Sequence, residues 1–166
     1  MKKYLLTLVA VLMTITASAQ FEEGKMYGSA SVTGLGLNYS GEKGLNLGVG
    51  AKAGYCFMDN WMVLAGVGLN TQTEEAKRNT DLEVGVGARY YIIQNGIYLG
   101  VNAKYKHYYN MDSKFHNDVL PGIEVGYAFF INHYCTIEPA VYYDQSFNNH
   151  GKYSTFGLKI GFGIYM

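Results

Sequence analysis

The stretch 155-TFGLKIGFGIYM-166 decides how this sequence is read. From Phe156 to Met166 every second residue is large and apolar, and glycines, a lysine and a tyrosine lie between them. An alternation with a period of two over this length predicts a β-strand. A soluble protein would be expected to protect such a strand, because an exposed apolar edge invites aggregation. We therefore expect an architecture in which this last strand has a hydrogen-bonded partner on each side.

The N-terminal residues are typical of an export signal. Lysines at positions 2 and 3 precede an apolar run over residues 4–15, and Ala-Ser-Ala at 17–19 provides a small-residue cleavage site. The run is shorter than the about 20 apolar residues that a membrane-spanning helix needs. We expect residues 1–19 to be a signal peptide of the Sec pathway that is cleaved, and residues 20–166 to be the mature domain.

Charge and length restrict the function further. The whole chain has thirteen basic and thirteen acidic residues, and loss of the two leader lysines leaves a formal net charge of −2. Such a balance gives no basic surface of the kind that attracts nucleic acid. The remaining length fits one domain, and no linker or low-complexity segment divides it.

Eight stretches of the mature chain alternate between apolar residues and small or polar ones, and we expect each to be a strand. The first is the least regular, because small residues at 28–31 blur its two faces, so its register stays open. The stretches are about Lys25–Tyr39, Leu45–Phe57, Trp61–Leu69, Leu82–Tyr90, Ile97–Tyr105, Val119–Phe129, Cys135–Tyr143 and Thr155–Met166.

The connections between these stretches alternate in length. Three are tight and carry the turn residues Asp, Asn and Gly, namely 57-FMDNW-61, 92-IIQNGI-97 and 129-FFINHY-134. The others, near 40–44, 71–81, 107–118 and 144–152, are polar and mostly longer. This pattern predicts an eight-stranded antiparallel up-and-down transmembrane β-barrel with short periplasmic turns and longer extracellular loops. We then expect extracellular positions to include Lys77, Lys114 and Asn149, and periplasmic ones to include Asn60, Asn95 and Asn132.

The two faces of the strands indicate which side meets lipid. One face carries large aliphatic and aromatic side chains, whereas an eight-stranded barrel has an interior just wide enough for side chains to fill it. The other face carries at least thirteen glycines and few charges, which would be a poor surface in water. We therefore expect the apolar face to point outward into lipid and the glycine-rich face to line the lumen. A secreted soluble barrel is the alternative.

The glycine-rich face also carries four basic and three acidic side chains. Because buried charge is costly unless it is paired, we expect an interior network of salt bridges and hydrogen bonds that fills the lumen, with glycines making room for the long side chains. A conducting or catalytic role for the same residues is the alternative. The seven residues are Lys52, Glu83, Arg89, Lys104, Glu124, Glu138 and Lys159.

Three stretches of the chain resemble a known protein family. The stretches 52-KAGYCFMDNWMVLAGVGL-69, 137-IEPAVYY-143 and 158-LKIGFGIYM-166 look like the small outer-membrane β-barrel proteins of Bacteroidota, similar in design to OmpX and the OmpA membrane domain. The resemblance covers essentially the whole mature chain. It implies insertion by the barrel-assembly machinery, which reads a C-terminal strand ending in an aromatic residue. Here Met166 ends the chain and Tyr165 is one place away from that position.

The sequence gives only weak signals for a catalytic site or a metal site. A lipid-modifying barrel enzyme needs a catalytic Ser near a His, and none of the four histidines lies in the His-x-Ser arrangement of the deacylases. Histidines 107, 116 and 150 lack the spacing of metal ligands, so we expect no cofactor and no metal. Cys56 and Cys135 fall on strands three places apart around the barrel, too far for a disulfide. Pro121 and Pro139 fall inside strands and predict a local bulge or widened pairing.

The sequence therefore favours a non-enzymatic outer-membrane protein with a structural or surface-interaction role. Its partners would be outer-membrane lipid, the barrel-assembly machinery and an extracellular ligand, matrix or host surface contacted by the loops. A narrow porin-like channel for small solutes is the second hypothesis, and a lipid-modifying enzyme is a distant third.

Overall fold

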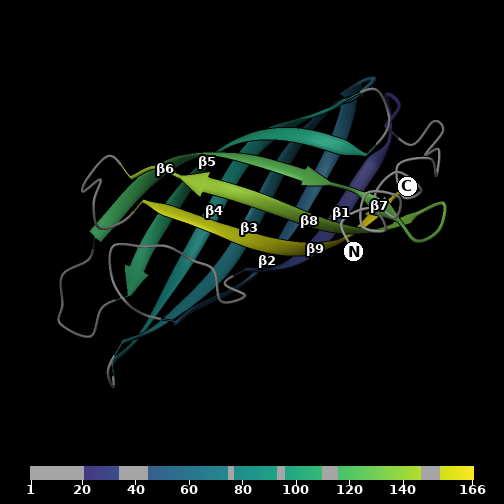
Figure 1. Cartoon of the computed structure of the whole chain (residues 1–166). Helices are drawn as coiled ribbons and strands as arrows, with labels where there is room; N and C mark the ends of the chain where they lie inside the picture. The colour runs from purple at the N-terminus through teal and green to yellow at the C-terminus, as the bar shows by residue number, and fades with distance from the viewer. Residues whose placement is uncertain (1–20, 34–44, 75–76, 93–95, 110–115, 147–153) are drawn as a thin grey trace, which may run out of the picture.

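A computed structural model describes residues 21–33, 45–74, 77–92, 96–109, 116–146 and 154–166. In it the chain forms a closed antiparallel β-barrel of eight strands (Figure 1). One of these strands is interrupted at Ala128, so that β6 and β7 are its two parts. The bounds are β1 Met26–Thr33, β2 Leu45–Met58, β3 Trp61–Glu74, β4 Lys77–Tyr91, β5 Ile97–Tyr109, β6 His116–Tyr127, β7 Phe129–Phe130, β8 Cys135–Asp144 and β9 Thr155–Tyr165.

The last strand has a partner on each side, as the alternation at the C-terminus predicted. β9 pairs with β8 from Cys135↔Ile164 to Asp144↔Thr155 and with β1 from Tyr27↔Tyr165 to Thr33↔Lys159. The terminal residue takes part as well, because Met26 and Met166 exchange two backbone hydrogen bonds of 2.8 Å. Pairing of β6 with β8 completes the circle. A closed barrel leaves no strand edge unpaired, which is what a β-structure in lipid requires.

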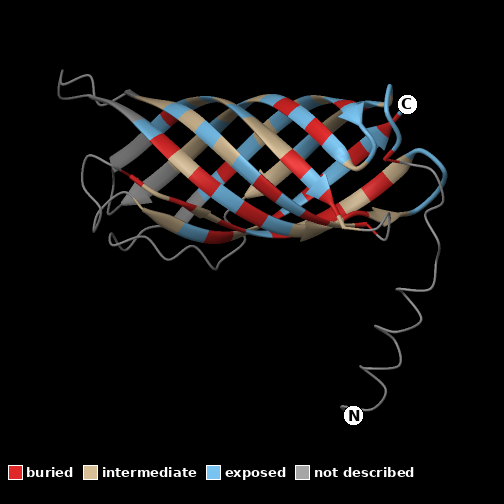
Figure 2. Ribbon diagram, turned by 90° about the horizontal axis from the view of Figure 1, so that it is seen from above, coloured by how far each residue is buried: buried red, intermediate tan, exposed pale blue. Residues whose placement is uncertain are grey.

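Exposure alternates along the strands as the two-face pattern predicted (Figure 2). Side chains such as Val49 and Val125 are exposed on the outside, whereas Arg89 and Lys159 are buried inside. The structure also fixes the register that the sequence left open. In β1 the buried side chain is Tyr27, and its neighbour Met26 points outward. The lumen is therefore lined by glycine, polar and tyrosine side chains, and the outer surface is apolar.

The short turns lie at the same end of the barrel as the C-terminus (Figure 1). Asp59 and Asn60 form the whole connection between β2 and β3, and Asn60 takes a positive φ of 65°. Asparagine tolerates this left-handed conformation better than most residues. In the turn before β8, Oδ1 of Asn132 accepts hydrogen bonds from the backbone N–H groups of Tyr134 and Cys135. These turns confirm the role of Asp and Asn that the sequence indicated.

The strands are longer at the opposite end than the sequence predicted. The expected loop over 71–81 is wrong, because β3 and β4 remain paired from Leu69↔Leu82 to Glu74↔Lys77. The expected loop over 107–118 is likewise shortened, since β5 continues to Tyr109 and β6 begins at His116. Backbone pairing does not need an apolar face, so it continues beyond the point where the apolar alternation ends. The predicted loop positions Lys114, Asn149 and His150 lie outside the described residues.

The two prolines behave differently. The β5–β6 register runs through Pro121 without a shift, and the carbonyl of Pro121 accepts the N–H of Gln145 where the β6–β8 pairing ends. A bulge at Pro121 is therefore not found. Pro139, on β8, lies where the pairing of β8 with β6 and β7 is interrupted, between Gly126↔Ala140 and Phe129↔Ile137. A proline has no N–H to give to a neighbouring strand, which accounts for this gap and confirms widened pairing there. Both cysteines are free, as predicted.

Candidate functional site in the barrel lumen

Arg89 on β4 is the centre of the charged lumen. Its Nε donates to Oε1 of Glu124 on β6 at 2.9 Å, and its Nη1 donates to Oε2 of Glu138 on β8 at 2.9 Å. All three side chains are at least 96% buried. A guanidinium that bridges two carboxylates uses its fixed fork geometry, which gives charge-assisted hydrogen bonds their strength. This bridge ties together three strands across the interior.

Two lysines reach the same carboxylate. Nζ of Lys52 on β2 lies 3.5 Å from Oε2 of Glu124, and Nζ of Lys159 on β9 forms an ion pair with the same oxygen. Glu124 thus receives one guanidinium and two ammonium groups. We name Glu124, Arg89, Lys52, Lys159 and Glu138 the central cluster. Its charges come from β2, β4, β6, β8 and β9, so it spans the lumen from one side to the other.

A second group of charges lies beside the central cluster. Nζ of Lys104 on β5 is 2.6 Å from Oδ2 of Asp144 and 3.4 Å from Oε1 of Glu83. Nδ2 of Asn70 donates to Oε2 of Glu83 at 3.1 Å. The structure therefore brings together all seven charged residues that the sequence placed in the lumen. It adds Asp144 and the pair Lys106–Asp81, whose Nζ and Oδ2 lie 3.1 Å apart.

Sequence patterns did not indicate those three residues, for a single reason. Asp81, Lys106 and Asp144 fall at or next to the expected loops, and the strands extend through these positions. With them, five basic and five acidic side chains form ion pairs among the described residues of the interior. The network is therefore balanced in formal charge, and a balanced network avoids leaving a buried charge without a partner.

Glycines make room for these side chains, as expected. Gly100 lies in register between Arg89 on one neighbouring strand and Glu124 on the other. A Cβ at Gly100 would lie 2.5 Å from Cγ of Glu124. A Cβ at Gly66 would lie 2.8 Å from Cγ of Lys52. Without side chains at these positions, the long charged side chains can cross the neighbouring strand and meet over it.

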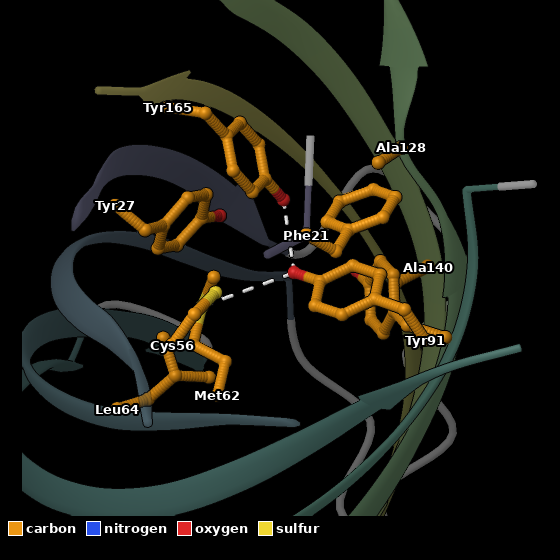
Figure 3. Packing of buried hydrophobic residues seen from close by; sticks show 10 residues of the cluster. Phe21, Tyr27, Cys56, Met62, Leu64, Tyr91, Ala128, Ala140 and Tyr165 are labelled. Carbon is orange, nitrogen blue, oxygen red and sulfur yellow. Dashed lines mark hydrogen bonds between the residues drawn. The ribbon is translucent and has the colours of Figure 1, made fainter. Parts of the chain in front are cut away.

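An aromatic group closes the lumen at the short-turn end (Figure 3). Phe21, which precedes β1, is fully buried there and stacks on Tyr91 with ring centroids 3.8 Å apart. Tyr165 and Phe130 pack on its other sides with centroids at 5.4 and 5.7 Å. We call this set, together with the buried Met62, Cys56, Tyr27 and Tyr98, the aromatic seal.

Backbone hydrogen bonds hold the segment that carries Phe21 in place. The carbonyl of Phe21 accepts the N–H of Asn60 at 2.8 Å. Gly24 donates to the carbonyl of Cys56, and Cys56 donates to the carbonyl of Lys25, at 2.8 and 2.9 Å. We name residues 21–25 the N-terminal strap. It lies at the short-turn end of the barrel and is fixed to the end of β2 and to the turn between β2 and β3.

The aromatic seal is bonded to the central cluster through tyrosine hydroxyls. The hydroxyls of Tyr27 and Tyr165 donate to the two oxygens of Glu138 at 2.7 and 3.0 Å. The hydroxyls of Tyr91 and Tyr165 are 2.9 Å apart. The guanidinium carbon of Arg89 lies 4.1 Å from the ring centre of Tyr98, a cation–π contact. Continuous polar contacts therefore lead from Tyr91 at the end of the barrel to Arg89 in its interior.

The aromatic seal was not predicted, although part of its signal is in the sequence. Tyr91 and Tyr98 have the same strand parity as the interior residues Arg89 and Gly100, and Tyr165 has the parity of Lys159. Parity alone would have placed all three tyrosines inside. Phe21 gives no such signal, because it precedes the first strand.

The other half of the lumen holds a cavity of ≈ 100 Å³. Its lining includes Ser31, Thr33, Lys52, Asn102, Asp144 and Lys159. Within the described part of the chain, no three His, Cys, Asp or Glu side chains are arranged to hold a metal ion. The arrangement can hold charges and bind polar groups.

Comparison of the chain with models of protein families and with curated proteins gives no match. Among solved structures, it is similar to the outer membrane protein OprG from Pseudomonas aeruginosa. The TM-score is 0.60 and the identity 16%, over 87% of this chain and 97% of that one. The chain has the fold of the outer-membrane β-barrels.

Two further structures agree with this fold. The N-terminal β-barrel domain of Pseudomonas aeruginosa OprF matches with a TM-score of 0.58 and 11% identity, over 87% of this chain and 98% of that one. The Yersinia pestis outer membrane protein Ail, in a phospholipid bilayer nanodisc, matches with a TM-score of 0.58 and 16% identity, over 85% and 99%. No helix among the described residues is long and apolar enough to span a membrane.

Proposed function

We propose that this protein is a non-enzymatic β-barrel of the outer membrane with a sealed lumen and a structural or surface-interaction role. In this proposal residues 1–19 are a signal peptide of the Sec pathway and are cleaved. The mature domain is inserted by the barrel-assembly machinery. The resemblance to small outer-membrane barrels of Bacteroidota belongs to the same proposal.

The observation that carries the proposal is the double obstruction of the lumen. The central cluster spans the interior with Arg89 bonded to Glu124 and Glu138. The aromatic seal obstructs the short-turn end with Phe21 fully buried among tyrosines. A barrel of eight strands has little interior volume beyond its own side chains. A role that depends on the outer surface and the loops therefore fits better than transport.

The same architecture supports the proposal of lipid and extracellular partners. The apolar outer surface fits the hydrocarbon of a bilayer, and aromatic residues near the strand ends, such as the neighbouring Trp61 and Tyr90, suit its interface. Ail, which has a similar fold, has been seen with the heparin analogue sucrose octasulfate. In this proposal the loops opposite the short turns contact an extracellular ligand or host surface.

A narrow channel for small solutes is the second candidate. The cavity in the half of the lumen away from the aromatic seal favours it, because that half is not filled by side chains. The channel hypothesis requires that ions pass both the central cluster and the aromatic seal. Single-channel recording of the refolded protein in planar bilayers separates the two candidates.

Labelling of intact cells tests the orientation on which the surface role depends. Single cysteines at position 77, at the start of β4, and at position 132, in a short turn, are compared in a background in which Cys56 and Cys135 are serine. An impermeant thiol reagent is expected to label position 77 on intact cells and position 132 only after lysis. Labelling of position 132 on intact cells would overturn the orientation.

A further inference from the structure

One wall of the cavity is formed by three neighbouring strands and is rich in hydrogen-bond donors. Lys52 on β2 and Lys159 on β9 lie on the two sides of β1, and the hydroxyls of Ser31 and Thr33 on β1 also line the cavity. Both lysines pair with a single carboxylate of the cavity lining, that of Glu124. The wall therefore has one positive charge in excess.

The acceptors of the cavity come from β4, β5 and β8. Lys104 pairs with both Glu83 and Asp144, so this group has one cation for two carboxylates. Asp144 is only 6% exposed, and its Oδ1 has no hydrogen-bond partner among the described residues. Oδ1 of Asn102 likewise has no hydrogen-bond partner among the described residues. A buried acceptor without a partner costs free energy unless a bound molecule satisfies it.

The two unpaired oxygens lie close together over a glycine. Gly122 is in register with Asn102 on β5 and with Asp144 on β8. A Cβ at Gly122 would lie 2.1 Å from Oδ1 of Asp144 and 2.8 Å from Oδ1 of Asn102. Both acceptors therefore converge on one point of the cavity wall. In the strand order β5 is opposite β1, so Asn102 faces the donor wall across the lumen.

The size of the cavity limits what can fill it. A bound water needs roughly 10–15 Å³ of such volume, so ≈ 100 Å³ accommodates about seven to ten atoms of that size. A small free amino acid such as alanine or serine is of this size. A lone anion would neutralise the excess positive charge of the donor wall and leave the excess negative charge of the acceptors. A lone cation would do the reverse.

We propose that the cavity is a binding site for a small zwitterion of the free amino-acid class. The carboxylate of the ligand accepts hydrogen bonds from Lys52 and from the hydroxyls of Ser31 and Thr33. Its ammonium group donates to Oδ1 of Asp144 and Oδ1 of Asn102. This site goes beyond the proposed surface role and does not depend on whether the barrel conducts ions.

Calorimetry and thermal unfolding of the refolded full-length barrel in detergent test the site, with alanine and serine as probes. Acetate and methylammonium, the two halves of the zwitterion, are compared at equal ionic strength. Binding of the amino acid stabilises the folded barrel by RT ln(1 + [L]/Kd), so the unfolding temperature rises with the concentration of the amino acid. We expect a measurable rise with alanine or serine and at least tenfold weaker binding of either half.

Variants assign the binding to these residues. Asp144→Asn keeps the shape of the side chain and removes the charge, and Ser31→Ala removes only a hydroxyl. Both are expected to weaken amino-acid binding, Asp144→Asn by at least tenfold. Glu22→Gln, an exposed charge removal outside the cavity, is the control and should bind as wild type does. The proposal is overturned if neither amino acid binds, if acetate or methylammonium binds as tightly, or if Asp144→Asn binds like the control.

Discussion

Phe21 lies face to face on Tyr91, with ring centroids 3.8 Å apart and an angle of 11° between the ring planes. This contact joins a residue outside the strands to the end of β4 and holds the N-terminal strap against the barrel. The strap also makes two backbone hydrogen bonds to Cys56, whose side chain is fully buried. The rate at which a reagent labels the Cys56 thiol therefore reports whether the strap is in place.

The first prediction is that Phe21→Ala exposes this thiol. Loss of a buried phenylalanine costs about 3–5 kcal/mol, which is enough to release a five-residue strap. In a Cys135→Ser background, we expect a water-soluble thiol reagent to label Cys56 at least ten times faster in Phe21→Ala than in wild type. Phe57→Ala, on the lipid face, is the matched control. Equal labelling rates in the two variants would show that Phe21 does not close the lumen.

The second prediction concerns the lipid face. Val49 and Val125 point outward from β2 and β6, with exposures of 54% and 50%. An arginine at either position should destabilise the barrel, by about 2–4 kcal/mol at the bilayer midplane and by less toward the interface, because a charge is poorly solvated in hydrocarbon. Ile131→Arg, in a short turn, is the control and should have little effect. Unfolding in lipid vesicles measures the difference, and equal destabilisation at Val125 and Ile131 would contradict the face assignment.

The third prediction tests the glycines of the lumen. Gly100→Ala places a methyl group against Glu124, so the Arg89–Glu124 pair must shift. Overpacking of this kind costs about 1–3 kcal/mol. Gly28→Ala is the matched control, because a Cβ there meets nothing within 4 Å. Chemical denaturation of both variants gives the comparison. Equal stabilities would mean that Gly100 is not needed to bring the two charges together.

The strands and their faces could be predicted because a period of two is a local signal. Each residue from Phe156 to Met166 indicates its own side, and the closure of β9 on β1 follows from the need to pair that strand. The same logic placed Arg89 and Glu124 in the lumen. It did not say that they would meet, because contacts across the lumen depend on the relative shift of distant strands.

Other features depend on interactions that no local pattern reports. The pairing of Thr71 with Thr80 extends β3 and β4 into a segment that reads as a polar loop. The sequence shows no apolar alternation there, and only the neighbouring strand determines the structure. Phe21 lies outside every strand, so its burial depends on a space that exists only once the barrel has closed.

In the proposed function the lumen is sealed, and the barrel is therefore expected not to conduct. Glu124 holds Arg89, Lys52 and Lys159, so Glu124→Ala leaves three cations around a single remaining carboxylate. Removal of one partner from a buried ion pair costs about 3–5 kcal/mol. We expect Glu124→Ala to unfold at a lower denaturant concentration than wild type.

Single-channel recording of the purified, refolded wild-type protein in planar bilayers tests the seal most directly, with Glu124→Ala measured in parallel. The sealed barrel predicts no steady current from wild type and a marked loss of stability in the variant. Steady wild-type currents, together with a change of ion selectivity and near-unchanged stability in Glu124→Ala, would contradict the account and establish a channel.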